Sequence, residues 1–324
     1  MQIRLYVANS CTLRGVIFLR VPWDIFHEMA VSLEARKRRW AYLFIAFPIV
    51  YFLGVRIFPM LYSFNISFRE WDILSPDKAF TGLRNFTALF ASHMFWKALR
   101  NTFLYTLVIV PTGLVLGLLI ALALNSITRA VVFFRILYFA PFVSSLVAIG
   151  FIWKWIYDPT FGWLNIILQT LSLPRQSFLQ DPSQVLLSIA AMTIWHGLGF
   201  QVIIFLAGLR SIPDMYYEAA RVDGASPRQV FWNITIPLLN PTLIFLTITS
   251  AIQSLRMFTQ VFNMTFPNVG GPLQNGTTLV LEIYQEAFHH FKMGYASAMT
   301  VILFCLIMTI TLVQFKFFSK KVEY

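Results

Sequence analysis

The chain has 324 residues, of which 58% are hydrophobic and only 12% are charged. A soluble domain is typically about 25% charged, so this chain has too little charge to cover a soluble globule and too much apolar sequence to stay disordered. The net charge of +11 does not indicate a nucleic-acid partner, because no arginine-rich arm, zinc-finger spacing or basic repeat accompanies it. We therefore expect an all-α integral membrane protein whose apolar excess faces the lipid bilayer.

The N-terminal residues fit the rest of the chain poorly. Three arginines interrupt residues 1–28, so no apolar segment long enough for a secretory signal forms there. A sequence that resembles a natural start begins at Met29 and reaches the membrane a few residues later. We interpret residues 1–35 as an extension, either a disordered tail or the product of a misplaced start, and residues 36–324 as a single transmembrane domain.

Six stretches are long and apolar enough to cross a bilayer, which takes roughly 20 residues. The fifth is expected to enter the membrane near Pro237. A further uncharged segment, 257–281, contains prolines and glycines that break the backbone, and broken backbone cannot satisfy its hydrogen bonds in lipid. We therefore expect that segment to be an exposed loop with turns. The six predicted spans are 40–68, 101–128, 136–153, 182–209, 229–255 and 293–315.

The distribution of Lys and Arg predicts the orientation of these spans. With the N-terminus inside, basic residues are about three times denser in the inside segments than in the outside segments, as the positive-inside rule requires. The basic cluster at 36–39, just before the first span, dominates that difference. An even number of spans then places both termini in the cytoplasm.

Sequence motifs of catalysis are missing from the chain. No Lys directly follows a Gly, so a nucleotide phosphate loop is excluded, and the metalloprotease and nucleophile-elbow patterns are also absent. Cys11 and Cys305 are too few and too far apart to predict a disulfide framework or a metal cluster. The doublet His289-His290 would point about 100° apart on a helix, which favours two interfacial polar residues. We expect no enzyme activity, no cofactor and no metal site.

The most specific pattern lies between the fourth and fifth spans, in residues 212–237. Asp214, just after a proline, is typical of a helix start, and Gly224 is typical of a helix C-terminus. Ser226, followed by a proline, is typical of a second helix start. These signals predict a helix–Gly–helix elbow on the cytoplasmic side. The elbow is too rich in apolar residues for a solvated linker, so we expect it to bind a protein partner.

The elbow also resembles a known family pattern. Glu-Ala-Ala, three residues, Gly, nine residues, Ile, one residue and Leu-Pro mark the membrane subunits of binding-protein-dependent ABC importers. This chain departs from the pattern once, with Ile236 in place of Leu. The resemblance covers about residues 40–318 and is to the sugar-type branch, similar to maltose and glycerol-3-phosphate permeases. The elbow residues that carry or fit it are Glu218, Ala219, Ala220, Asp223, Gly224, Ile234 and Pro237.

This resemblance implies a fold, a membrane and a set of partners. The fold is that of a type I ABC importer permease with six transmembrane helices, in a bacterial-type cytoplasmic membrane. The partners are a second permease subunit that completes a heterodimer, two ATP-binding subunits, an extracytoplasmic solute-binding protein, and a sugar or related solute. The elbow would dock into a groove of the ATPase, with Glu218 paired to a basic residue and Gly224 permitting the turn.

One face of the fifth span is the candidate solute pathway. Its polar residues recur at i, i+3, i+4 and i+7, which places them on one side of a helix, facing protein or water rather than lipid. Contact between helices is the competing interpretation; the resemblance favours the pathway, because this region contacts sugar in maltose-type members. Arg256 lies off this face and is expected to extend to the outer interface, so the face favours a neutral sugar. The candidates are Ser250, Gln253, Ser254, Met257 and, on the fourth span, His196.

Two other functions remain as alternatives. An ion-coupled secondary transporter often has inverted repeats and intramembrane acids, and neither is evident in the six predicted spans. A membrane assembly protein that binds partners without transport could carry a similar elbow. Solute uptake in a strain that lacks only this chain distinguishes both alternatives from an importer subunit.

Overall fold

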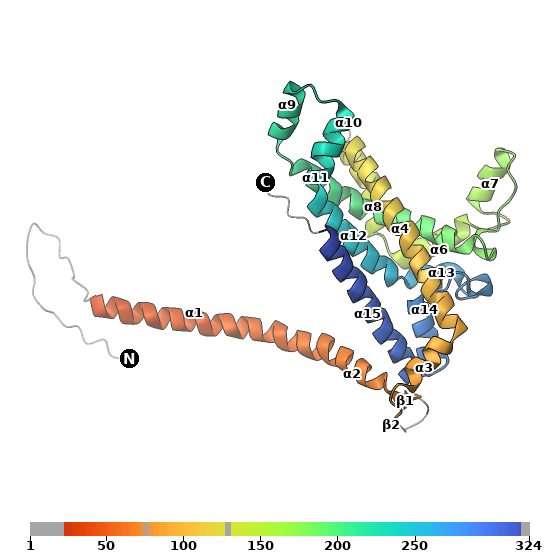
Figure 1. Ribbon diagram of the computed structural model, residues 1–324, viewed down its shortest axis with the longest axis horizontal. Coiled ribbons are helices and arrows are strands. Elements are labelled where there is room, and N and C mark those ends of the chain that lie inside the picture. The colour runs from red at the N-terminus through yellow and green to blue at the C-terminus, as the bar shows by residue number, and fades with distance from the viewer. Residues whose placement is uncertain (1–22, 73, 75–77, 127–130, 319–324) are drawn as a thin grey trace, which may run out of the picture. The chain divides into compact units, whose positions relative to one another are not determined.

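The computed structural model describes residues 23–72, 74, 78–126 and 131–318 (Figure 1). The chain divides into two units, Met1–Tyr62 and Ser63–Tyr324. The described part of the first unit comprises α1 (Trp23–Phe52), the π-helical turn η1 (Leu53–Ile57) and the start of α2 (Phe58–Ile66). Most of the predicted N-terminal extension lies outside the described residues, and the rest of it, from Trp23 onward, belongs to α1.

The second unit is a bundle of long helices with shorter elements at its ends. In Figure 1, α9 and α10 lie at one end of this bundle, and α3 and the two strands lie at the opposite end. The strands pair antiparallel, with Arg69 opposite Phe80. The elements are β1 (Arg69–Trp71), β2 (Lys78–Phe80), α3 (Arg84–Ala91), α4 (His93–Ser126), α5 (Val131–Val143), α6 (Leu146–Ile156), α7 (Trp163–Thr170), η2 (Phe178–Gln180), α8 (Val185–Arg210), α9 (Asp214–Val222), α10 (Pro227–Val230), η3 (Phe231–Thr235), α11 (Ile236–Leu238), α12 (Asn240–Leu255), α13 (Thr259–Thr265), η4 (Pro272–Gln274), α14 (Leu279–Tyr284), η5 (Gln285–His289) and α15 (Met293–Phe318).

Four helices of the described chain are long and apolar enough to cross a membrane, and two bent helix pairs bring the number to six if each pair is one span. The protein is therefore an all-α, multi-pass membrane protein. The four unbroken helices correspond to the first, second, fourth and sixth predicted spans. They are Glu34–Ile66, His93–Ser126, Val185–Arg210 and Met293–Lys316.

The third predicted span is not one straight helix. Its two halves, α5 and α6, meet at an angle of 108°. Ser145, with φ of −58° and ψ of 122°, leaves helical geometry before α6 begins. The hydroxyl of Ser144 donates to the carbonyl oxygen of Ala140 at 2.9 Å. Pro141 also removes a backbone donor from the last turn of α5. Hydropathy did not predict this break, because the residues on both sides of Ser144 and Ser145 are apolar.

The fifth predicted span is also bent, by 64° between Pro227–Leu238 and α12. Pro237 and Pro241 flank the bend, and neither can donate a backbone hydrogen bond. The side chain of Leu239, at the bend itself, is fully buried in a core cluster that α4, α8 and α12 share. The bend is thus held by packing, and it separates the elbow from the membrane part of the span.

Close packing of α4 against α8 forms the centre of the bundle (Figure 1). Gly113 and Gly117, one turn apart on α4, lie against Gln201 of α8. A Cβ atom added to Gly113 would lie 2.8 Å from Nε2 of Gln201, and one added to Gly117 would lie 3.0 Å from its Cβ. Small residues at this spacing let two membrane helices approach closely. Because the two glycines have no side chains, they also leave the space in which the amide of Gln201 is buried.

The segment 257–281 is not the exposed loop that the sequence predicted. It forms α13, η4 and the start of α14, and much of it is buried. Polar groups of α4 satisfy its backbone: Asn101 donates to the carbonyl oxygen of Thr277 at 3.1 Å, and the hydroxyl of Thr102 accepts from the amide of Leu279 at 2.9 Å. Irregular backbone is excluded from lipid but not from the interior of a membrane protein, which is why the prediction was wrong.

Candidate coupling elbow and solute cavity

The first helix of the elbow, α9, ends as the sequence predicted. Gly224 has φ of +71°, in the left-handed region. Its amide donates to the carbonyl oxygen of Arg221 at 3.2 Å, and the amide of Ala225 donates to that of Ala220 at 2.9 Å. These two bonds form a Schellman motif, which satisfies carbonyl groups that the helix end would leave unpaired. The motif turns the chain toward the second helix.

The second helix of the elbow begins at a capping box. The hydroxyl of Ser226 accepts from the amide of Gln229 at 3.4 Å, and the side chain of Gln229 accepts from the amide of Ser226 at 2.8 Å. From there α10, η3 and α11 run on to the bend. The hydroxyls of Tyr217 and Thr235 lie 3.4 Å apart and join the two arms. The capping box and the contact between these two hydroxyls thus hold the two arms of the elbow in a defined arrangement.

The outer surface of the elbow combines apolar side chains with a free carboxylate. Val222 is 88% exposed, Met215 67% and Trp232 59%. Glu218 is exposed and makes no hydrogen bond or ion pair within the described part of the chain. Among the other predicted coupling residues, Ala219, Asp223 and Pro237 are exposed, Ile234 is half-buried, and Ala220 is buried. Several large apolar side chains exposed on one short segment are typical of a protein interface.

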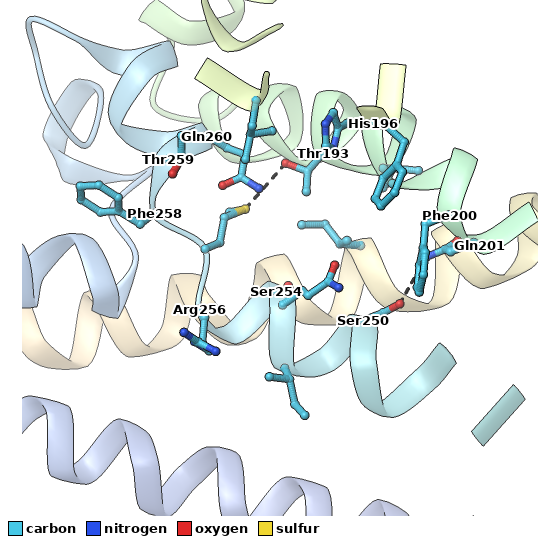
Figure 2. A pocket seen from close by; sticks show the side chains of 18 residues that line it. Thr193, His196, Phe200, Gln201, Ser250, Ser254, Arg256, Phe258, Thr259 and Gln260 are labelled. Carbon is cyan, nitrogen blue, oxygen red and sulfur yellow. Dashed lines mark hydrogen bonds between the residues drawn. The ribbon is translucent and has the colours of Figure 1, made fainter. Parts of the chain in front are cut away.

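A cavity of about 370 Å³ opens between α8 and α12 (Figure 2). All five predicted pathway residues line it: Ser250, Gln253, Ser254, Met257 and His196. The periodic face of the fifth span is therefore turned toward the fourth span, as Figure 2 shows for Ser250 and Ser254 opposite His196. Two side-chain contacts cross between these segments, from Gln201 Nε2 to Ser250 Oγ at 3.3 Å and from Thr193 Oγ1 to Met257 Sδ at 3.7 Å.

Three polar atoms around this cavity have no hydrogen-bond partner among the described residues. They are Nε2 of His196, Oε1 of Gln201 and Oγ of Ser254, all of them buried. A buried polar group without a hydrogen-bond partner costs about 1–3 kcal/mol, so three such atoms around one cavity are uncommon in a well-packed protein interior. Aromatic side chains complete the wall, with the ring of Phe142 lying 6.0 Å from that of His196, centroid to centroid. This combination of aromatic faces and hydrogen-bonding groups suits a small polar solute.

Two lining residues were missed or misplaced by sequence reasoning. The side chain of Gln201 packs against the two glycines of α4. The signal in the sequence that could have identified it is that Gln201 is a single amide within an apolar run. Arg256 was expected outside the pathway, yet it is among the lining residues, because the helix ends at Leu255 and the chain turns there. The preference for a neutral sugar, which rested on the absence of a cation, is therefore withdrawn.

The described residues contain no group of three or more His, Cys, Asp or Glu side chains that could hold a metal ion. His290 contacts Glu286, with Nδ1 and Oε1 3.3 Å apart, rather than its neighbour His289. Cys305 is a free, exposed thiol, and Cys11 lies outside the described residues.

A bundle of membrane-crossing helices, with a polar cavity in its interior and an exposed elbow at one end, is the arrangement expected of a membrane permease. The family described as binding-protein-dependent transport system inner membrane component matches residues 113–324, and the chain belongs to it. It is the membrane permease subunit of an ABC importer.

Named relatives agree with this family, and a solved structure has a similar fold. The chain is 34% identical to the probable ABC transporter permease protein YesP of Bacillus subtilis, over 91% of this chain and 96% of the relative. It is 32% identical to the multiple sugar-binding transport system permease protein MsmF of Streptococcus mutans, over 89% and 97% of the two chains. The fold is similar to that of a bacterial ABC transporter involved in import of the acidic polysaccharide alginate, with a TM-score of 0.78 at 23% identity, over 90% of this chain and 99% of that chain.

Proposed function

We propose that this permease imports a carbohydrate or a related solute through the cavity between α8 and α12, and that its elbow couples the cavity to ATP hydrolysis on a separate ATPase. The observation that carries the proposal is continuity: the elbow and the lining face of α12 belong to one segment, from Asp214 to Met257. Movement of the docked elbow shifts the lining face, so that the cavity is exposed alternately to the two sides of the membrane.

The names of relatives support a carbohydrate-type solute. MsmF is named for multiple sugars, and a relative from Agrobacterium fabrum, 32% identical over 89% of this chain, is named for sulfoquinovosyl glycerol. The lining of the cavity agrees with such solutes, because it combines rings with amide, hydroxyl and imidazole groups. Arg256 at the same cavity makes an acidic sugar as acceptable as a neutral one.

The proposed assembly contains more than this chain. A second, different permease subunit completes the translocation pathway, and two ATP-binding subunits dock on the elbows at the cytoplasmic face. An extracytoplasmic binding protein delivers the solute on the other side. The exposed apolar surface of α9 and the free carboxylate of Glu218 support this docking. We place the assembly in a bacterial-type inner membrane.

Deletion of this chain alone is expected to abolish uptake of the solute in the native host, because the pathway is then incomplete. Uptake of radiolabelled sugars measures the effect, and re-expression of the chain is the control. Under the proposal, uptake in the parental strain also stops when the partner ATPase is inactivated. Uptake that continues without the ATPase but collapses with the ion gradient would instead identify a secondary transporter. Normal uptake without this chain would identify an assembly protein.

The purified chain is expected neither to bind nor to hydrolyse ATP, since no Lys directly follows a Gly anywhere in its sequence to form a phosphate loop. Equilibrium binding of labelled ATP at millimolar concentration measures this, with the assembled importer as the positive control. Saturable nucleotide binding to the isolated chain would contradict the separation of roles between permease and ATPase.

A further inference from the structure

Two hollows meet on the surface of α4, outside the solute cavity. One, of about 690 Å³, lies between the first turns of α4 and the start of α8, and includes His93, Trp96, Lys97 and Arg100 in its lining. The other, of about 510 Å³, lies between α4, α12 and α15 and is lined mostly by apolar side chains. Arg100 and Leu104 line both hollows. A basic compartment therefore opens directly into an apolar groove.

The basic compartment carries the positive charges of Lys97 and Arg100 in its lining. Among the residues that the structure describes, no Asp or Glu lines either hollow. The ammonium group of Lys97 donates to the carbonyl oxygen of Leu273, which leaves its charge in place. Arg100 makes no hydrogen bond or ion pair within the described residues. A guanidinium is permanently charged and presents a planar set of donors, the geometry that suits phosphate oxygens.

The two hollows also lie at depths that match the parts of a lipid. Arg100 is the last charged residue before the long uncharged stretch of α4, which puts it at the boundary of the hydrocarbon. Trp96, half-exposed one turn earlier, is the residue type that anchors helices at headgroup level. The apolar groove continues from Arg100 toward Pro111, at the level of the acyl chains. Within it Leu107 is 70% exposed.

We propose that this paired hollow binds one anionic phospholipid from the outer leaflet. Its phosphate group contacts Arg100 and Lys97 in the basic compartment, and one acyl chain lies in the groove between α4, α12 and α15. Charge complementarity selects an anionic headgroup over a zwitterionic one. A fully apolar occupant, such as a helix of a partner subunit, would leave the guanidinium of Arg100 without an anion.

The test is lipid retention by the assembled importer, measured by native mass spectrometry after equilibration with vesicles of equal parts phosphatidylglycerol and phosphatidylcholine. The parental complex is expected to retain phosphatidylglycerol preferentially. Arg100→Gln is expected to lower that preference about fivefold, the usual contribution of one basic residue near a lipid surface. Arg175→Gln removes an equal charge from an exposed outer position that lines neither hollow, and is expected to leave the preference unchanged.

A second variant tests the groove separately from the charge. Leu107→Trp fills the groove with an apolar side chain, so insertion into the membrane is retained while lipid retention falls. A photoreactive residue at position 107 is then expected to crosslink to phosphatidylglycerol in the parental complex. The proposal is overturned if Arg100→Gln and Arg175→Gln have equal effects, if both lipids are retained equally, or if the crosslink forms to a protein helix instead.

Discussion

Glu218→Lys and Gly224→Val are each expected to abolish solute uptake while leaving the permease in the membrane. Gly224 holds φ of +71°, where an ordinary side chain costs about 1 kcal/mol and a β-branched one costs more. Valine at this position disfavours the left-handed conformation that the Schellman motif requires, and that motif sets the direction in which the chain enters α10. Glu218 is exposed and has no partner within the described part of the chain, so reversal of its charge is expected to act on docking. An unpaired charge in an interface costs about 3 kcal/mol or more, over a hundredfold in affinity.

The measurements are uptake, co-purification of the ATPase and the amount of permease in the membrane. Gly224→Asn is the matched control, because asparagine tolerates the left-handed conformation better than other residues, and it is expected to keep most of the uptake. Arg228→Gln changes an exposed charge elsewhere on the elbow and is expected to keep the ATPase bound. If both damaging variants reach the membrane, retain the ATPase and transport at the parental rate, the elbow does not couple.

Substitution of the cavity face by leucine is expected to lower uptake without affecting assembly. Gln253→Leu and Ser254→Leu remove groups that line the cavity. The loss of one or two hydrogen bonds to solute, each worth about 0.5–1.5 kcal/mol, amounts to roughly tenfold in apparent affinity. Ser250→Leu also removes the acceptor of the Gln201 amide, 3.3 Å away, so its effect is expected to be at least as large.

Uptake as a function of solute concentration separates affinity from maximal rate, and co-purification of the ATPase reports assembly. Thr249→Leu is the matched control: the change is the same in kind and lies on the same helix, but Thr249 does not line the cavity. Equal uptake by all three cavity variants would support the competing interpretation, in which these side chains only join helices. Loss of uptake with Thr249→Leu as well would indicate a general defect of α12.

The sequence was sufficient for features that depend on local backbone chemistry. Gly224, Ser226 and the proline after it predicted the turn and the capped helix, because left-handed backbone and a free helix N-terminus each require particular residue types nearby. The face of the fifth span followed from helical periodicity alone. Its role in transport stays a prediction, as does the role of each elbow residue.

Features that depend on contacts between distant residues could not be predicted in this way. The segment after Met257 looked like an exposed loop, since nothing in its own sequence shows that Asn101 and Thr102 would supply its hydrogen bonds. Likewise, Gln201 gained significance only once α4 was seen to pack its glycines against it. Hydropathy also treated 136–153 as one crossing, because it measures composition and not the direction of the chain.

The bend at Leu239 has a consequence for how this permease can change during evolution. Between the bend and the cavity, α12 is an uninterrupted helix, so each residue inserted there would turn the lining face by about 100° and advance it by about 1.5 Å. One insertion would direct Gln253 and Ser254 away from α8 while leaving the elbow itself intact. Solute preference can therefore diverge by substitution at the lining positions, whereas the number of residues between Leu239 and Ser250 is fixed by geometry.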